Sequence, residues 1–220
     1  MVANMNDNYI PRVGERVEIA SRYVKKCKKL LDVGCGDGII THFLKRKVTK
    51  IYGIDKSKED LKKAKKRGVI TKYIDLDKEK IPFRNSFFDV VTCLDVIEHI
   101  KDPVNLIREI NRVLRRNGTL ILSAPNIRFS DHLLKLIVGG RFPKTSEDNT
   151  AWDGGHIHYF TFSDLKLILN QEGFNVIYEE GIINKEKRGI KGKIAEKILG
   201  KKFMREFRSP GILIVAQKIK

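Results

Sequence analysis

The chain has 220 residues, and its 44 Lys and Arg against 27 Asp and Glu give a formal net charge of +17. This length suits one α/β domain with a full hydrophobic core, and the absence of any run of about 18 apolar residues excludes a transmembrane segment. Part of the positive charge reflects a bias towards Lys, Glu and Ile that is typical of hyperthermophile proteins. The remaining positive charge is suited to bind nucleic acid, anionic membranes or acidic small molecules.

Strand-like and helix-like segments alternate along the first half of the chain. An amphipathic helix is predicted at about 10–28, because apolar residues recur there at helical spacing. The dipeptide Asn117-Gly118 is interpreted as the C-terminal cap of a later helix. The predicted strands are 30–33, 50–54, 69–74, 88–94 and 119–124, and the helices between them are 39–47, 58–66 and 104–115.

Two insertions interrupt the second half. The first, at about 127–160, is long and lid-like, and loops of that length in compact domains are usually functional. The second, at about 184–208, is basic, with ten Lys or Arg against three Glu. A helix and two strands complete the chain, at 163–172, 174–178 and 211–216.

These elements predict an α/β fold in a single domain of residues 1–220. Strands that are apolar along their whole length and alternate with helices are typical of a parallel sheet covered by helices on both faces. The three cysteines, Cys27, Cys35 and Cys93, lack the spacing of a metal site and indicate a reducing compartment. Residues 1–9 lack the apolar core of a signal peptide. We therefore expect a soluble, cytoplasmic protein.

The most informative stretch is a glycine-rich turn at 34–38. Gly34, Gly36 and Gly38 follow an apolar strand and directly precede a helix. Glycines at such a turn let the backbone fold sharply and let a ligand approach main-chain atoms. Asp55 ends the next apolar run and is placed to accept hydrogen bonds from the two hydroxyls of a ribose. Together these features indicate a site for an adenosine-containing cofactor.

Spacing and charge distinguish the candidate cofactors. The third glycine of a dinucleotide fingerprint would fall at Ile39, and no P-loop lysine follows. Asp32 and Asp37 surround the turn with negative charge, which suits a cationic ligand better than a pyrophosphate. S-adenosylmethionine carries a sulfonium and an ammonium and no phosphate, so it fits best. A nicotinamide cofactor stays an alternative, because Asp55 would serve it too.

Five segments stand in a characteristic order along the chain: 32–38, 54–55, 81–91, 94–100 with 102–103, and 120–126. In order and spacing they resemble the motifs of the class I S-adenosylmethionine-dependent methyltransferases, and the subgroup of ubiquinone-biosynthesis methyltransferases is the most similar. The resemblance implies a Rossmann-like, doubly wound, mostly parallel seven-stranded sheet with helices on both faces and an antiparallel final strand. The last two predicted strands would then pair in a hairpin.

The resemblance also implies which residues bind the cofactor. The glycine turn is expected to hold the methionine part and Asp55 the ribose. Asp75 and the residue after it would flank the adenine, with Asp77 as a rival because this loop is longer than usual. Leu94 would line the site near the transferred methyl, whereas a solvated surface position is the better interpretation of Lys56. The full set is Asp32, Gly34, Cys35, Gly36, Gly38, Asp55, Lys56, Asp75, Leu76 and Leu94.

Methyl transfer from a sulfonium needs an aligned nucleophile and, for a hydroxyl or an amine, a base that removes its proton. The candidates for that base are His99, His156 and His158. His99 can equally buttress its own segment, and the aromatic-rich loop with His156 and His158 can equally act as a lid. Asp153 with this His-x-His pair is a candidate metal set, but two imidazoles without further ligands do not define a site, so no metal is predicted.

The methyl acceptor is expected to be a small or lipid-like molecule that is methylated at oxygen or nitrogen. No Asn/Asp-Pro-Pro-Tyr/Phe motif follows the fourth strand, which argues against methylation of a base amine. The basic insertion leaves RNA as the alternative partner, although it has few aromatic residues to stack on bases. A membrane-surface helix explains its charge equally well. The oligomeric state stays open.

Overall fold

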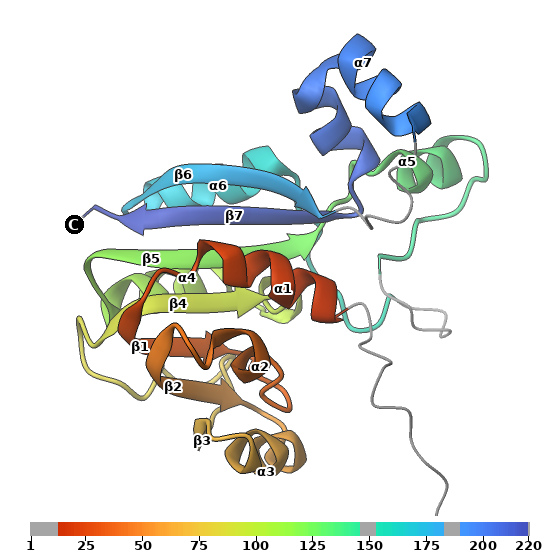
Figure 1. Cartoon of the computed structure of the whole chain (residues 1–220). Helices are drawn as coiled ribbons and strands as arrows, with labels where there is room; N and C mark the ends of the chain where they lie inside the picture. Colours follow the sequence, from red (N-terminus) through yellow and green to blue (C-terminus); the bar gives the residue numbers. More distant parts are fainter. Residues whose placement is uncertain (1–12, 146–152, 183–189, 220) are drawn as a thin grey trace, which may run out of the picture.

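The computed structural model describes residues 13–145, 153–182 and 190–219, and helices alternate with strands along most of the chain (Figure 1). The strands are β1 (Cys27–Val33), β2 (Val48–Asp55), β3 (Ile70–Tyr73), β4 (Phe88–Leu94), β5 (Leu114–Pro125), β6 (Phe174–Ile182) and β7 (Gly211–Lys218). The helices are α1 (Val13–Tyr23), α2 (Ile40–Leu44), α3 (Lys58–Lys66), the 3₁₀ helix η1 (Ile97–His99), α4 (Pro103–Val113), α5 (Ser130–Ile137), α6 (Phe162–Gln171) and α7 (Ile190–Arg208).

Seven strands of the described chain form one sheet, in the order β3-β2-β1-β4-β5-β7-β6. Strands β1 to β5 pair in parallel, whereas β7 runs antiparallel to both of its neighbours. Strands β2 and β3 are added on one side of β1, and β4 is then added on the other side. This confirms the predicted Rossmann-like, doubly wound, mostly parallel sheet and the hairpin of its last two strands.

Helices cover both faces of the sheet because the strands are apolar on both sides. In β5, Leu120 and Leu122 belong to one buried cluster, and Ile121 between them belongs to another. The cluster around Ile121 also contains residues of α1, α2 and α3, and the opposite one contains residues of α4 and α6. Figure 1 shows α1 across the near face of the sheet, with α4 and α6 behind it.

The first two helices are shorter than predicted. α1 ends at Tyr23, and β1 begins at Cys27, within the segment expected to be helical. α2 ends at Leu44 rather than near residue 47. The parallel pairing of β1 with β2 starts at Cys27 and Val48, so the chain has to leave the helical conformation before each of these positions. Strand pairing therefore outweighs the local helical spacing.

The prediction that Asn117 caps α4 was wrong. The N–H of Phe87 donates to the carbonyl of Val113 at 2.8 Å, and Phe88 pairs with Leu114, so the chain passes from α4 directly into β5. Asn117 has a φ of +59° and lies where the register of β4 and β5 shifts. Asn tolerates this left-handed conformation in a helix cap and in a strand irregularity alike. Only the pairing with β4 decides between the two.

Both insertions contain a helix. The first carries α5 and rejoins the sheet where Asn126 bridges to Phe160. The second carries α7, which breaks at Gly200. Figure 1 shows both helices beyond the end of the sheet to which the arrows of β4 and β5 point. Across the described ranges, every helix is too short or too polar to cross a bilayer. Parts of the predicted segments lie outside the described residues, at 10–12, 146–152 and 183–189.

Gly38 is expected to be required for the packing of α3 against the turn after β1. Its φ is +79°, and a Cβ there would lie 2.9 Å from the backbone Cα of Ala64. Gly38→Ala should cost about 1–2 kcal/mol of unfolding free energy for the left-handed backbone and about 1–3 kcal/mol more for overpacking, measured by urea unfolding.

Gly68→Ala is the matched control for Gly38→Ala. Gly68 has a φ of +92°, but a Cβ there would meet nothing within 4 Å. This variant should lose only the backbone contribution. Equal losses of unfolding free energy in the two variants would show that crowding against α3 is not the reason for Gly38.

Candidate active site

The turn after β1 is fixed to the end of β2. The N–H groups of Gly34 and Cys35 both donate to the carbonyl of Ile54, at 2.9 and 3.1 Å. The order of the strands reverses at this place, because β1 lies between β2 and β4. Open α/β sheets bind ligands at such a reversal, beyond the carboxyl ends of the strands. The glycine turn, residues 34–38, therefore lies where this fold binds ligands.

Two glycines of the turn have different surroundings. Gly34 packs tightly, because a Cβ there would lie 2.3 Å from Cγ2 of Val96. Gly36 has a φ of +49°, but a Cβ there would meet nothing within 4 Å. The backbone at Gly36 is thus bordered by open space rather than by another side chain. A ligand can approach main-chain atoms there at close range.

The carboxylate of Asp55 faces the same turn. One of its oxygens accepts a hydrogen bond from the N–H of Gly36 at 2.9 Å, and the other accepts one from the N–H of Ser57 at 2.8 Å. The residue is only partly buried, and each carboxylate oxygen can accept a further hydrogen bond. Beside an open backbone turn, this carboxylate is suited to bind two neighbouring hydroxyls, such as those of a ribose.

Asp32 is a buried carboxyl group near the end of β1. The hydroxyl of Thr92 donates to its Oδ1 at 2.7 Å, and the residue is 6% exposed. Burial raises the pKa of Asp32 to about 7, although the Thr92 hydrogen bond opposes the shift, and the charge of Asp55 adds to it. A cationic ligand bound at the glycine turn would stabilise the ionised form of this group.

Asp75 and its rival Asp77 follow β3. Asp75 forms an ion pair with Lys78 at 2.7 Å, and hydrogen bonding in this pair lowers the pKa of Asp75. Asp77 accepts a hydrogen bond from the N–H of Lys101 at 2.9 Å and so holds the loop to the chain after η1. Both carboxylates therefore already have partners within the chain, and the preference for Asp75 in the adenine contact stays a prediction.

The other predicted cofactor contacts differ in burial. Cys35 is buried, and a Cβ at Gly53 would lie 2.6 Å from its sulfur, so the thiol fills the space beside β2. Leu76 and Leu94 are partly buried, and Lys56 is exposed. Their roles towards a cofactor stay predictions.

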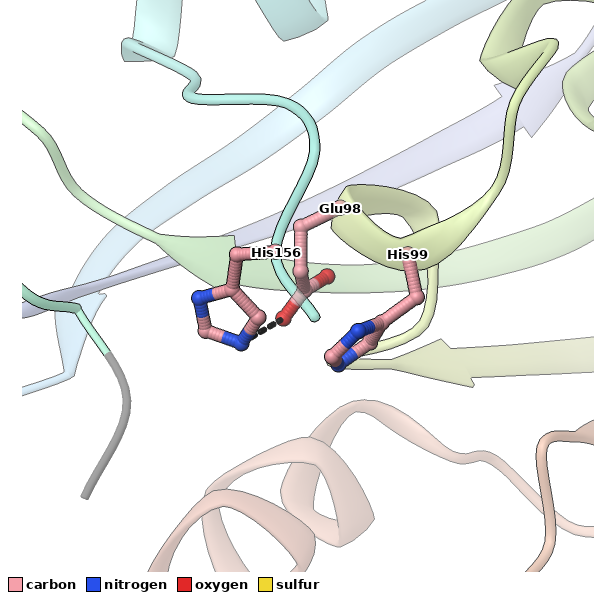
Figure 2. Close-up of side chains that lie close together, drawn as sticks. All are labelled: Glu98, His99 and His156. Carbon is pink, nitrogen blue, oxygen red and sulfur yellow. Dashed lines mark ion pairs between the residues drawn. The ribbon is translucent and has the colours of Figure 1, made fainter. Parts of the chain in front are cut away.

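Two of the three candidate histidines come together around Glu98, as Figure 2 shows. Glu98 and His99 belong to η1, and His156 comes from the end of the first insertion. Nε2 of His156 lies 3.9 Å from Oε1 of Glu98, and the rings of His99 and His156 are 4.6 Å apart. The N–H groups of Ile157 and His158 donate to the carbonyl of Glu98, at 2.9 and 3.1 Å, and join the two segments. We call Glu98, His99 and His156 the Glu98 cluster.

The side chain of His158 lies apart from the Glu98 cluster. Its Nε2 is 3.4 Å from the carbonyl oxygen of Lys101, and its ring lies beside Phe160. The His156-x-His158 pair is therefore not directed at one ligand. His156 meets His99 instead, which comes from a distant part of the chain.

Glu98 is a fully buried carboxyl group without a hydrogen-bond donor. Its side chain is 1% exposed, and neither oxygen has a hydrogen-bond partner in the described part of the chain. Burial raises the pKa of Glu98 to about 7. Its own backbone N–H, which is near the carboxyl group but makes no hydrogen bond to it, and the charge of Arg16 oppose the shift. Buried polar atoms without a partner are rare in native proteins. This carboxyl group is therefore stable only when it holds a proton or faces a cation.

Neighbouring groups fix the orientation of both imidazoles. Nδ1 of His99 lies 3.1 Å from the carbonyl oxygen of Gly155. Nδ1 of His156 lies 2.6 Å from the hydroxyl of Thr145, which donates to Asp153 at 2.6 Å. Burial lowers the pKa of His156, and the nearness of His99 lowers it further, although Asp153 opposes this. The lowered pKa favours a neutral ring for His156. In both rings the contacts place a proton on Nδ1 and leave Nε2 free of these partners.

The sequence did not single out Asp95 and Arg16, which lie at the same edge. Asp95 directly follows β4 and has a φ of +54°, a conformation that is uncommon outside glycine and is often retained at functional sites. Its carboxylate accepts hydrogen bonds from the hydroxyl of Ser123, at 2.9 Å, and from the guanidinium of Arg16. The only available signal was its position directly after the fourth strand, because a positive φ cannot be read from an aspartate.

Comparisons with known proteins agree with this geometry. A family model described as a methyltransferase domain matches residues 5–179. The ubiquinone biosynthesis O-methyltransferase of Aeromonas salmonicida is 32% identical over 132 residues, which are 56% of this chain and 55% of that protein. The protein of the same name from Colwellia psychrerythraea is 31% identical over 159 residues, 70% of this chain and 63% of that protein. The matched segments thus cover 55% and 63% of the length of these two relatives.

Solved structures show the same fold. A S-adenosylmethionine-dependent methyltransferase from Archaeoglobus fulgidus superposes with a TM-score of 0.67 at 19% identity, and the match covers 94% of each chain. At this identity the likeness concerns the fold and says nothing of the substrate. It agrees with the sheet order and with the antiparallel β7.

Asp55→Ala is expected to weaken S-adenosylmethionine binding by about 10- to 100-fold, because hydrogen bonds to a charged group contribute about 1.5–3 kcal/mol. Asp55→Asn retains one acceptor oxygen for Gly36 or Ser57 and should lose less. Titration calorimetry measures both. Glu59→Gln on α3, with a side chain that is 81% exposed, is the control and should bind as the wild type does. An unchanged affinity in Asp55→Ala would place the ribose elsewhere.

Asp32→Asn is expected to change how stability depends on pH. The pKa of Asp32 is about 7 in the folded chain and has its ordinary, lower value in the unfolded chain. Between about pH 4 and 7 the folded state therefore binds more protons, and the wild type loses up to about 1.4 kcal/mol of stability per pH unit as pH rises. The variant lacks this loss, so its unfolding free energy relative to the wild type should increase across this window. Parallel pH profiles in urea unfolding would contradict the assignment.

Proposed function

Because the chain belongs to the methyltransferase-domain family, we propose that it transfers a methyl group from S-adenosylmethionine to a hydroxyl oxygen of a small or lipid-like molecule. One observation carries the proposal: the glycine turn and the Glu98 cluster lie side by side at one edge of the sheet. Val96 is the link, since its side chain packs against Gly34 and it stands just before η1, which carries Glu98.

The residues around the glycine turn fit the cofactor. Gly36 leaves open space beside the main chain, Asp55 offers acceptor oxygens for a ribose, and Asp32 offers a carboxyl group for a cationic amino-acid part. When bound there, S-adenosylmethionine supplies a methyl carbon that its positive sulfur already activates. The chain therefore has to align the acceptor, exclude water and remove a proton, rather than create an electrophile.

The Glu98 cluster is suited to the acceptor side of the reaction. A proton leaves the hydroxyl as its oxygen attacks, and a group with a pKa near neutrality accepts such a proton best. Burial brings the pKa of Glu98 to about 7, and His156 beside it presents a neutral imidazole. The burial of both groups also limits the access of water. This arrangement supports methylation of a hydroxyl.

Two further observations support oxygen as the acceptor atom and a lipid-like acceptor. The relatives at about 30% identity are named as O-methyltransferases of ubiquinone biosynthesis. In addition, α5 and the chain after it expose apolar side chains at the end of the sheet where the cluster lies, a surface suited to an apolar acceptor. The most exposed of them are Leu134, Ile137, Val138 and Phe142.

The basic second insertion offers less support for RNA, the alternative partner. In its described part, Arg205 forms ion pairs with Glu179 and Glu206, and its guanidinium lies 4.6 Å from the ring of Phe162. Glu206 also pairs with Arg128 at 3.1 Å. Arginines that neutralise carboxylates of the same chain contribute less to phosphate binding. RNA therefore stays second to a small acceptor.

Methyl transfer should be detectable with radiolabelled S-adenosylmethionine and lysate fractions divided into RNA, protein, lipid and small metabolites. Label should enter the lipid or small-metabolite fraction in a form stable to mild alkali, as an ether is. His156→Asn should lower the rate about 10²- to 10⁴-fold and leave cofactor affinity unchanged. His42→Asn, an exposed imidazole on α2, is the control and should leave both unchanged.

Two results would count against this proposal. Label that enters only the RNA fraction, with binding that weakens steeply with salt, would support the alternative. A protein that binds the cofactor but labels no fraction would overturn the assignment as a methyltransferase.

A further inference from the structure

We propose that the Glu98 cluster binds one divalent transition-metal cation, such as Zn²⁺, and that this cation holds the hydroxyl oxygen of the methyl acceptor. One ligand atom from each of Glu98, His99 and His156 can be chosen so that all three lie within 4.8 Å of one another. Figure 2 shows the three side chains converging from η1 and from the end of the first insertion. The first part of the proposal concerns binding alone, and the second rests on the proposed function.

The state of Glu98 is the first argument for a cation. Its carboxyl group is buried at 1% exposure, and no donor in the described ranges reaches either oxygen. Burial of an ionised carboxylate without a partner is costly. The charge of Arg16 acts on Glu98, but its guanidinium pairs with Asp95. His99 and His156, which adjoin Glu98, present ring nitrogens rather than a fixed positive charge. A cation shared by the three groups would satisfy both carboxylate oxygens and both lone pairs.

The orientation of the imidazoles is the second argument. Histidines that bind metals usually donate their other ring N–H to a carbonyl, a carboxylate or a similar acceptor, which fixes the tautomer. His99 does so through Nδ1 to the carbonyl of Gly155, and His156 does so through Nδ1 to Thr145, which in turn donates to Asp153. Each ring is thereby left with Nε2 for a ligand. For His156 this atom is the one that faces Glu98.

The distances are compatible with a bound cation after small side-chain shifts. Bonds of about 2.0–2.2 Å to a tetrahedral Zn²⁺ place ligand atoms about 3.4 Å apart. Nε2 of His156 and Oε1 of Glu98 are 3.9 Å apart. Three protein ligands leave a fourth position open, which is the arrangement of catalytic rather than structural zinc sites.

The donor set favours a transition metal over Mg²⁺ or Ca²⁺. Two imidazoles and one carboxylate suit Zn²⁺ and its first-row neighbours, whereas Mg²⁺ and Ca²⁺ prefer sites made of oxygen ligands. The two histidines of the His156-x-His158 pair cannot both be ligands here, because His158 lies against the carbonyl of Lys101. Glu98 and His99 supply the two ligands that the pair does not.

The cation would act on the acceptor hydroxyl at its open position. As a Lewis acid it lowers the pKa of a bound hydroxyl, so that the proton passes to water and the oxygen stays bound as an oxyanion. That oxygen then forms the bond to the methyl carbon while the carbon–sulfur bond breaks, and the sulfur keeps the bonding electron pair. No oxidant or reductant is needed.

Metal binding can be measured without the methyl acceptor. The full chain is freed of metal with a chelator and titrated with Zn²⁺ in a calorimeter, and with Co²⁺ while its visible absorption is recorded. We expect one cation per chain and the bands of a four-coordinate cobalt site. Glu98→Gln and His156→Asn should each weaken binding by more than about 100-fold, and Thr145→Val, which removes only a partner of His156, by about 10- to 100-fold.

His158→Asn is the matched control, because it removes an imidazole from the same loop but outside the cluster. It should bind Zn²⁺ as tightly as the wild type does. Absence of binding, or equal affinities in Glu98→Gln and the wild type, would overturn the metal site and leave the cluster as a metal-free proton acceptor. Methyl transfer that persists at full rate after chelation would overturn the role of the cation towards the acceptor and uphold the proposed function. A chain that binds Zn²⁺ at the cluster but transfers no methyl group would uphold the site and refute the function.

Discussion

The site depends on one local constraint, the attachment of the glycine turn to the end of β2. The carbonyl of Ile54 accepts the N–H groups of Gly34 and Cys35, and the carboxylate of Asp55 accepts that of Gly36. These three bonds replace strand pairing just where β1 stops, and they hold the turn open instead of letting it fold onto the sheet. Because the strand order reverses beside β1, the turn lies where open α/β sheets bind ligands.

The same constraint sets the position of the Glu98 cluster. Gly34 has no Cβ, so Val96 packs directly on the turn and brings η1 with it. The carbonyl of Glu98 in η1 then accepts two N–H groups from the end of the first insertion, at Ile157 and His158. Segments separated by α4, β5 and α5 are joined through this single carbonyl. The glycine turn and the Glu98 cluster thus share one edge of the sheet.

Much of the fold could be predicted from the sequence, because the strands are apolar on both faces and the glycine turn has a recognisable spacing. The errors occurred where local signals served two structures equally well. Asn117 tolerates a left-handed backbone in a helix cap and in a strand irregularity, and pairing of Leu114 with Phe88 decided for the latter. Cys27 fitted the helical periodicity of the preceding segment until its pairing with Val48 placed it in β1.

The sequence by itself determined the alternation of strands and helices outside the two insertions, the glycine turn and the acidic residue that ends β2, since all of these follow from local pattern. It did not determine which histidine meets Glu98. His156 and His158 are equivalent in pattern, and only the docking of their loop on η1 turns one towards Glu98 and the other towards Lys101. The unpartnered carboxyl group of Glu98 has the same origin, because burial and the absence of donors are properties of packing between distant segments, not of neighbouring residues.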